Sequence, residues 1–128
     1  MGIGKVKESV IQTQIVEYLS AISRSHGFLF FSVPNEGMMT AALMGSLPKS
    51  AMFAMLTKFK KMGMHSGASD LVLGWKGRMY AVEVKSDTGK QSENQRLFES
   101  WCKSCEVPYR LVRSVHDVSE ALIEWGIV

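Results

Sequence analysis

Asp70, Glu83 and Lys85 carry side chains that together can promote hydrolysis, and they fall within one short stretch of the sequence. Carboxylate oxygens are the ligands that Mg²⁺ and Mn²⁺ prefer in proteins. An ammonium group beside such a site can position a water molecule or stabilise negative charge that develops in a transition state. Neither paired histidines nor a zinc-type cysteine set accompanies these residues, so they predict a site for a hard divalent cation rather than for zinc.

A β-hairpin is expected to bring the three side chains together. Two strand-like apolar segments, 71–73 and 79–84, flank a Lys-Gly dipeptide that suits a two-residue turn. Because alternate residues of a strand share a face, Glu83 and Lys85 point the same way, and pairing across the turn brings Asp70 level with them. We expect this cluster at the strand ends rather than in the core, so that its substitution leaves folding intact.

An acid that opens one strand, followed by Glu-x-Lys at the end of the next, resembles the PD-(D/E)XK nuclease superfamily. Further positions, spread over nearly the whole chain from about Glu8 onward, resemble the virus-type replication-repair nuclease (VRR-NUC) domain of that superfamily. The matching positions are Pro34-Asn35, Gly63, Gly67, Asp70-Leu71, Glu83-Val84-Lys85, Ser92 and Gln95. Two positions depart from the pattern: Ser69 stands where proline is usual, and Glu36-Gly37-Met38-Met39 replaces a segment that often contains an arginine.

This resemblance implies an α/β fold with a restriction-endonuclease-like core, in which helices flank a mixed β-sheet. It implies a metal-dependent DNA endonuclease that uses Mg²⁺ or Mn²⁺ to hydrolyse phosphodiester bonds. Asp70, Glu83 and the main-chain carbonyl of Val84 are then metal ligands, and Lys85 positions the attacking water or stabilises the transition state. The length of 128 residues fits a single domain over residues 1–128.

Glu8 is a further candidate ligand. Apolar residues recur at helical spacing between Val6 and Ser25, and at about 100° per residue Glu8 falls close to the buried side of that helix. Related nucleases often carry a first-helix glutamate that completes the metal site. The alternative is that Glu8 only occupies the first helical turn, where the helix dipole favours an acid.

Gln95 also has two interpretations. Ser92 begins a predicted helix that runs to about Cys105, and Ser-x-x-Gln is the arrangement of a capping box at a helix N-terminus. The family resemblance instead gives Gln95 a role in catalysis, because it lies just beyond Glu-x-Lys and would orient the water or a phosphate. The sequence does not choose between the two.

The remaining segments are expected to complete a mixed sheet with helices packed on it. The apolar run 28–33 predicts a buried strand that Pro34 ends, and a strand at 108–112 and a helix at 114–125 close the chain. Segment 49–62 predicts a helix with a methionine-rich apolar face. Its opposite side carries Lys58, Lys60 and Lys61, which are either contacts for DNA phosphates or simply a solvated face.

The predicted working unit is a homodimer that cuts branched DNA, such as four-way (Holliday) junctions. One domain holds one site and cuts one strand per binding event, so paired cuts need two copies, and the methionine-rich face at 49–62 is expected to join them. Stand-alone members of the resembling family are regarded as dimeric junction-cutting enzymes. The alternatives are a monomeric flap or nicking nuclease and a non-catalytic nucleic-acid-binding module of the same fold.

The composition is that of an ordinary globular protein, with 21% charged and 46% hydrophobic residues. A net charge of +3 permits nucleic-acid binding without requiring it. Apolar stretches fall far short of the ~20 residues that span a bilayer, and the first residues do not resemble a signal peptide, which favours a cytoplasmic protein. Cys102 and Cys105 form one Cys-x-x-Cys pair near the end of a predicted helix, which suits neither a complete zinc site nor an activated redox thiol.

Overall fold

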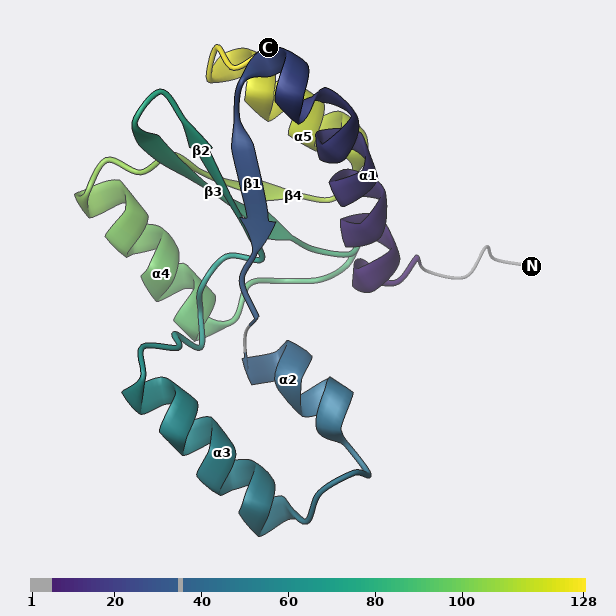
Figure 1. Ribbon diagram of the computed structural model, residues 1–128, viewed down its shortest axis with the longest axis vertical. Coiled ribbons are helices and arrows are strands. Elements are labelled where there is room, and N and C mark those ends of the chain that lie inside the picture. Colours follow the sequence, from purple (N-terminus) through teal and green to yellow (C-terminus); the bar gives the residue numbers. More distant parts are fainter. Residues whose placement is uncertain (1–5, 35) are drawn as a thin grey trace.

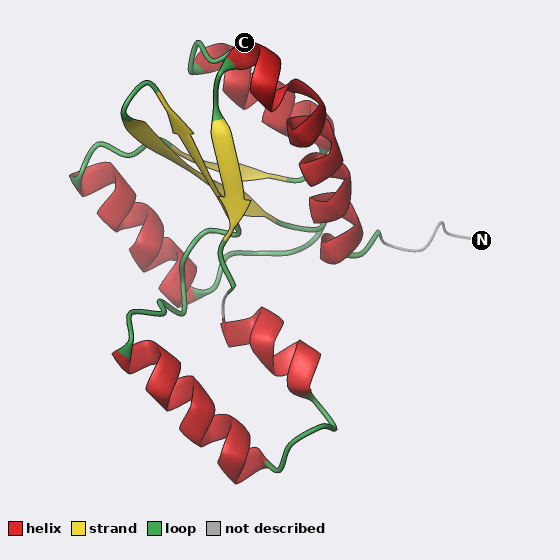
Figure 2. Cartoon of the chain, in the orientation of Figure 1, coloured by secondary structure: helices red, strands yellow, loops and turns green. Residues whose placement is uncertain are grey.

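The computed structural model describes residues 6–34 and 36–128. Within these ranges the chain forms a mixed β-sheet with helices on both faces, as the sequence predicts (Figure 1; Figure 2). In chain order the elements are α1 (Glu8–His26), β1 (Leu29–Ser32), α2 (Glu36–Leu43), α3 (Lys49–Lys61), β2 (Leu71–Trp75), β3 (Arg78–Val84), α4 (Glu93–Ser104), β4 (Tyr109–Val112) and α5 (Val115–Glu124). None of the helices in the described ranges has the length and apolar character of a membrane span.

The sheet has the strand order β1-β2-β3-β4. β1 and β3 both run antiparallel to β2, whereas β4 runs parallel to β3 and is reached through the crossover helix α4. The β2–β3 turn contains Lys76 and Gly77, both with positive φ (47° and 75°), which is the backbone of a two-residue type I′ hairpin. The predicted hairpin is therefore confirmed, with Trp75 paired to Arg78 at its tip.

The apolar core lies between one face of the sheet and the helices α1 and α5, which pack side by side (Figure 1). It contains Ile11, Ile15, Leu19, Phe28, Leu71, Leu73, Tyr80, Val82, Val84, Val112, Val118, Leu122 and Ile127. Because side chains alternate along a strand, Val82 and Val84 point into this core while Glu83 between them points to the other face. That second face is covered by α4 only over part of its width, since α4 packs along β4.

β1 is an edge strand, so the predicted buried strand at this position is wrong in its burial. Leu29 is 60% exposed and Phe31 is 53% exposed. The described strands pair β1 with β2 alone, and α4 lies at the opposite edge of the sheet. A run of apolar residues has the strand-forming composition wherever it lies in the sheet, so the sequence could not distinguish a central strand from an edge strand.

The helices α2 and α3 pack on each other and project from the sheet as an arm (Figure 1). The predicted helix at 49–62 is confirmed as α3, which Met62 ends. Its predicted apolar face is only partly covered: Leu56 is buried, whereas Met62 is 71% exposed. Phe53, on another side of the same helix, is 74% exposed.

Candidate active site

Asp70 and Glu83 lie at the end of the hairpin that is farthest from its turn. Leu71 pairs with Val82, so Asp70, one residue earlier, stands level with Glu83 on the same face of the sheet. The Asp70 Oδ2 atom accepts a hydrogen bond of 2.7 Å from the main-chain N–H of Val84. The N–H and C=O of one residue leave a strand on the same side, so the Val84 carbonyl is also directed toward Asp70.

The cluster is deeply buried. The exposed fraction is 0% for Glu83, 4% for Asp70 and 9% for Lys85. The expectation that these side chains stay outside the core is therefore wrong: they stand at strand ends, but the surrounding elements close over them. Removing one of a set of buried charges leaves the others without compensation, so substitutions here will also affect stability.

Burial, followed by the charge of the neighbouring Asp70, raises the pKa of Glu83 to about 9, and Lys85 opposes the shift. Two neighbouring buried carboxylates can both be ionised only if a cation lies between them, and otherwise they hold a proton. The Glu83 Oε2 atom is buried and has no hydrogen-bond partner among the described residues. This unsatisfied oxygen is the feature of the cluster that calls for a ligand.

Glu8 reaches the cluster from the first turn of α1. Burial raises its pKa, Lys85 lowers it, and Asp70 raises it, so the carboxyl group lies within electrostatic reach of both residues. Glu8 therefore lies in the first turn of α1, close to the other acids, and its role as a metal ligand stays a prediction. Within residues 6–34 and 36–128, however, no three His, Cys, Asp or Glu side chains are close enough to hold a metal ion by themselves.

Gln95 forms the predicted capping box and also contacts the buried cluster, whereas its role in catalysis stays a prediction. The Gln95 Oε1 atom accepts a hydrogen bond from the main-chain N–H of Ser92 (2.8 Å), and the main-chain N–H of Gln95 donates to the Ser92 hydroxyl. These two hydrogen bonds complete the capping box of α4. The Gln95 Nε2 atom donates to Glu83 Oε1 at 2.5 Å. The helix cap thus fixes the amide that holds Oε1 of Glu83, while Oε2 has no hydrogen-bond partner among the described residues.

Gly67 permits the close approach that brings Asp70 beside α4. A Cβ atom at this position would lie 2.1 Å from the main-chain oxygen of Asn94, in the first turn of α4. The main-chain N–H of Gly67 donates to His65 Nδ1 (3.1 Å), and the His65 ring packs at 5.0 Å from the Trp101 ring of α4. These contacts hold the segment before Asp70 against the helix that carries Gln95.

Sequence reasoning missed two residues near the cluster. Tyr109 begins β4 on the same face of the sheet as Glu83, and burial, followed by the charge of Glu83, raises the pKa of its phenol. The Arg113 guanidinium donates to the carbonyls of Ser86 and Gly89 (2.9 Å to Gly89) and so fixes the loop that follows Lys85. The strand pattern at 108–112 could have indicated the face of Tyr109, whereas no local signal links Arg113 to a loop 24 residues away.

The other predicted positions lie outside the buried cluster. Lys58, Lys60 and Lys61 are exposed in the last turn of α3. Cys102 is buried and Cys105 is exposed; both are free, and burial raises the pKa of the Cys102 thiol, which opposes a redox role. Asn35, part of the Pro-Asn motif, lies outside the described residues.

Comparison with known proteins adds one match. The family model described as "VRR-NUC domain" matches residues 7–116 of the chain. No curated protein and no solved structure matches it. The matched range contains each of the side chains that form the buried cluster.

Proposed function

The chain belongs to the VRR-NUC family, nuclease domains of the PD-(D/E)XK type that act on DNA, and we propose that it is a Mg²⁺- or Mn²⁺-dependent endonuclease that cuts branched DNA as a homodimer. The observation that carries the proposal is the buried Asp70–Glu83 pair, with Lys85 beside it and one Glu83 oxygen unsatisfied. A module that only bound nucleic acid would gain nothing from carboxylates facing phosphates, because like charges repel.

The donor atoms suit a hard divalent cation. Asp70, Glu83 and the Val84 carbonyl supply only oxygen, and Mg²⁺ commonly binds through one or two carboxylates while it keeps several waters. Because the three acids do not form a complete cage, Glu8 would act through water or at the margin of the site. When bound, the cation would neutralise charge on the phosphate and favour deprotonation of the attacking water.

The protein's own side chains have separate tasks in this proposal. Gln95 holds Oε1 of Glu83 and thereby aims Oε2 at the ligand. The main-chain N–H of Lys85 donates to the Val112 carbonyl (2.9 Å), which anchors the residue to β4 so that its ammonium group can stabilise charge on a phosphoryl oxygen. Arg113 keeps the following loop in place behind it.

DNA binding is assigned to exposed basic side chains outside the buried cluster. Lys58, Lys60 and Lys61 occupy the end of α3 that leads back toward the sheet (Figure 1), where they would contact phosphates. Replacing all three by alanine should weaken binding of every DNA sequence alike and flatten the dependence of affinity on salt. An unchanged salt slope would remove these lysines from the interface.

The arm of α2 and α3 is the proposed dimer contact. Met44, Phe53 and Met62 are 72%, 74% and 71% exposed, an apolar surface of the kind that a two-fold partner covers. A hollow of about 320 Å³ lies where the arm joins the segments that lead to the sheet, and it is lined by Pro34, Met39, Phe59, Met62 and Met64. Two copies of the chain would place one buried cluster beside each of two DNA strands. Paired cuts in a four-way junction require two such sites.

The test is a cleavage assay on plasmid, linear and four-way-junction DNA with and without Mg²⁺, combined with light scattering. We expect metal-dependent paired cuts in the junction and about twice the 14.3 kDa chain mass. Charged substitutions at Met55 and Phe59, and Phe53→Glu, should give monomers that no longer make paired cuts. Ile123→Glu is the matched control, because Ile123 is 61% exposed on α5. A wild-type monomer that still makes symmetric cuts would refute the dimer.

A further inference from the structure

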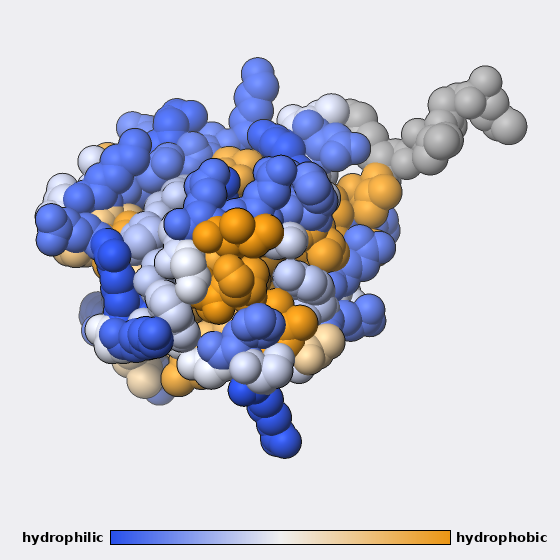
Figure 3. Space-filling model, turned by 90° about the horizontal axis from the view of Figure 1, so that it is seen from above, coloured by the Kyte–Doolittle hydropathy of each residue, from blue (hydrophilic) through white to orange (hydrophobic). Residues whose placement is uncertain are grey.

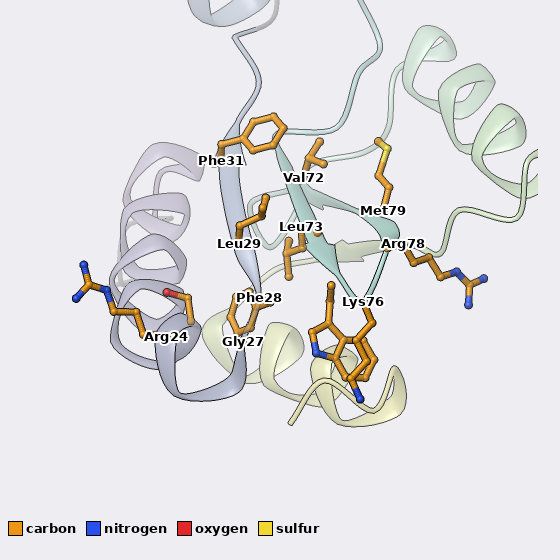
Figure 4. A pocket seen from close by; sticks show the side chains of 14 residues that line it. Arg24, Gly27, Phe28, Leu29, Phe31, Val72, Leu73, Lys76, Arg78 and Met79 are labelled. Atoms are coloured by element: carbon orange, nitrogen blue, oxygen red, sulfur yellow. The ribbon is translucent and has the colours of Figure 1, made fainter.

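The two ends of the β2–β3 hairpin differ in character. A hollow of about 600 Å³ opens beside the Lys76 turn, and its lining includes Leu29 and Met79 (Figure 4). Seen from above, the surface of the molecule has a hydrophobic patch framed by hydrophilic side chains (Figure 3). The opposite end of the hairpin carries the buried acids with Lys85 beside them. The groups that can act chemically therefore gather at that end, and the segment that follows Lys85 is part of their surroundings.

Residues 86–89 fold back as a turn directly after Lys85. The main-chain N–H of Gly89 donates to the Ser86 carbonyl (3.1 Å), which closes the turn. A Cβ atom at Gly89 would lie 3.4 Å from Cδ of Lys85 and 3.0 Å from Oγ of Ser86. The turn therefore lies alongside the hydrocarbon stem of Lys85 and forms a wall for it, in keeping with the 9% exposure of this residue.

The 86–89 turn is held by Arg113, the residue that follows β4. Its Nη1 atom donates to the carbonyls of Ser86 and Gly89 (2.9 Å to Gly89), which are the two ends of the turn. Hydrogen bonds from a charged donor stabilise more than those between neutral groups, and the planar guanidinium gives them fixed directions. One side chain thus fixes both ends of the wall beside Lys85.

Arg113 is itself fixed by its place in the fold. Val84 and Val112 are the last paired residues of β3 and β4, and Lys85 and Arg113 each follow by one residue. The main-chain N–H of Lys85 donates to the Val112 carbonyl (2.9 Å). The main-chain N–H of Arg113 donates to Oδ2 of Asp117, in the first turn of α5 (2.9 Å). The backbone of Lys85 is therefore held by β4, whereas its side chain is bounded by a turn that depends on Arg113.

We propose that Arg113 is a positioning residue for cleavage, because it holds the 86–89 turn against the stem of Lys85 and so sets where the ammonium group lies. This inference rests on the proposed nuclease function. A lysine side chain is a flexible four-carbon stem, so its ammonium group occupies many positions unless neighbouring atoms restrict it. Arg113 contacts neither DNA nor metal in this proposal and acts only through Lys85.

The first test is a double-mutant cycle measured by single-turnover cleavage of four-way-junction DNA. Arg113→Ala should reduce the rate about 10²-fold, the effect of a small displacement of a catalytic group. The affinity for DNA, measured by fluorescence anisotropy in a metal-free buffer, should stay unchanged. In the Lys85→Ala background the same substitution should cause no further loss, because residues that act as a unit have non-additive effects.

Two further variants separate the bonds of Arg113 from its charge. Arg113→Lys keeps the charge and should recover part of the lost rate. Arg110→Ala is the matched control, because it also removes a guanidinium from β4. Arg110 pairs in the sheet with Val82 and forms an ion pair with Glu124 of α5, so it belongs to the opposite face. Its substitution should leave cleavage near the wild-type rate.

The second test does not depend on cleavage. The metal-free full chain is treated with limiting acetic anhydride, and the modification of each lysine is followed by mass spectrometry. Arg113→Ala should raise the rate at Lys85 at least about 5-fold through local opening of the turn, whereas Lys103, exposed on α4, should be unchanged. Thermal unfolding of each sample distinguishes this local effect from loss of the fold. If Arg113→Ala does not fold, Arg113→Lys replaces it and should show a smaller change in the same direction.

Three results would overturn the inference. Unchanged acetylation of Lys85 in a folded Arg113 variant would show that the turn does not restrict the lysine. A further loss of cleavage in the Lys85→Ala background would mean that Arg113 acts independently, and weaker DNA binding would make it a phosphate contact. Failure of the proposed function would look different: wild-type protein would cut no DNA with Mg²⁺ or Mn²⁺, while acetylation of Lys85 would still respond to Arg113→Ala.

Discussion

The two faces of one sheet differ in packing and in chemistry. The face toward α1 and α5 is closed and apolar, and Leu71, Leu73 and Val82 are fully buried there. The face toward α4 has buried acids at one end and the exposed side chains of Leu29, Phe31 and Met79 at the other. Since alternate residues of a strand point to opposite faces, β2 and β3 serve the core with one set of side chains and the site with the other. Neighbouring residues of one strand should therefore have separable effects.

The largest effect is expected on the site face. Asp70→Ala, Glu83→Ala and Lys85→Ala should each reduce single-turnover cleavage by at least about 10³-fold, because the first two remove a proposed metal ligand and the third removes a charge that would act on the transition state. Thermal unfolding of the same samples shows whether the buried substitution also costs stability. Wild-type cleavage by any of the three variants would contradict the role of that residue.

On the core face, Leu73→Ala should lower the free energy of unfolding by about 2–5 kcal/mol through loss of buried surface and creation of a cavity. Cleavage by the folded fraction should stay near the wild-type rate, because Leu73 points away from the acids. Val72→Ala, on the opposite face of the same strand, is the control and should cost less stability, since Val72 is only half-buried. Denaturant titration and cleavage of the same preparations separate the two effects.

On the site face, the contact between α4 and the segment before Asp70 can be loosened at Gly67. In Gly67→Ala the added methyl group would overlap the Asn94 carbonyl, so the segment before Asp70 must move away from α4 and Gln95. A displacement of about 1 Å at a catalytic group can reduce activity roughly 10²-fold. The neighbouring Ser66→Ala should leave cleavage near wild type, and an active Gly67→Ala variant would show that the approach of α4 is not needed.

The smallest expected effect is a pH dependence of stability. The pKa of Glu83 is raised from 4.5 to about 9 in the folded protein, so the folded state holds a proton that the unfolded chain releases. Stability without metal should therefore be highest below about pH 4.5 with respect to this group, and should fall as the pH rises toward 9.

Glu83→Gln is the control for this titration, because it keeps the shape of the side chain and removes the ionisable group. Its melting temperature should change less between pH 5 and pH 9 than that of the wild type. Saturating Mg²⁺ should reduce the wild-type dependence, since a cation replaces the proton between the two acids. Parallel pH profiles for wild type and Glu83→Gln would show that Glu83 is not the titrating group.

Local sequence patterns predicted several features of the hairpin and of the site. The Lys76-Gly77 turn, the alternation around Glu83, and the Ser92–Gln95 capping box depend on residues close in sequence, and all three are confirmed. The position of Glu8 followed from the helical period. These features share one cause, which is that backbone geometry fixes which neighbouring side chains lie on the same side.

What the sequence did not predict depends on contacts between distant segments. The exposure of Phe31 depends on which edge of the sheet α4 leaves uncovered, and the depth of Glu83 depends on α4 closing over it. The approach of Gly67 to Asn94 joins residues 27 positions apart, and nothing in either segment indicates it. A single sequence gives the chemistry of a residue more readily than the element that will cover it.

The most direct test of the central account is a calorimetric titration with Mn²⁺ at a pH where the site can release its proton. The account predicts that wild-type protein binds the ion with release of a proton, that Glu83→Gln loses this binding, and that Lys85→Ala keeps most of it while it fails to cut DNA. Binding by Glu83→Gln with wild-type affinity and proton release would contradict the assignment of the Asp70–Glu83 pair as the metal-binding centre.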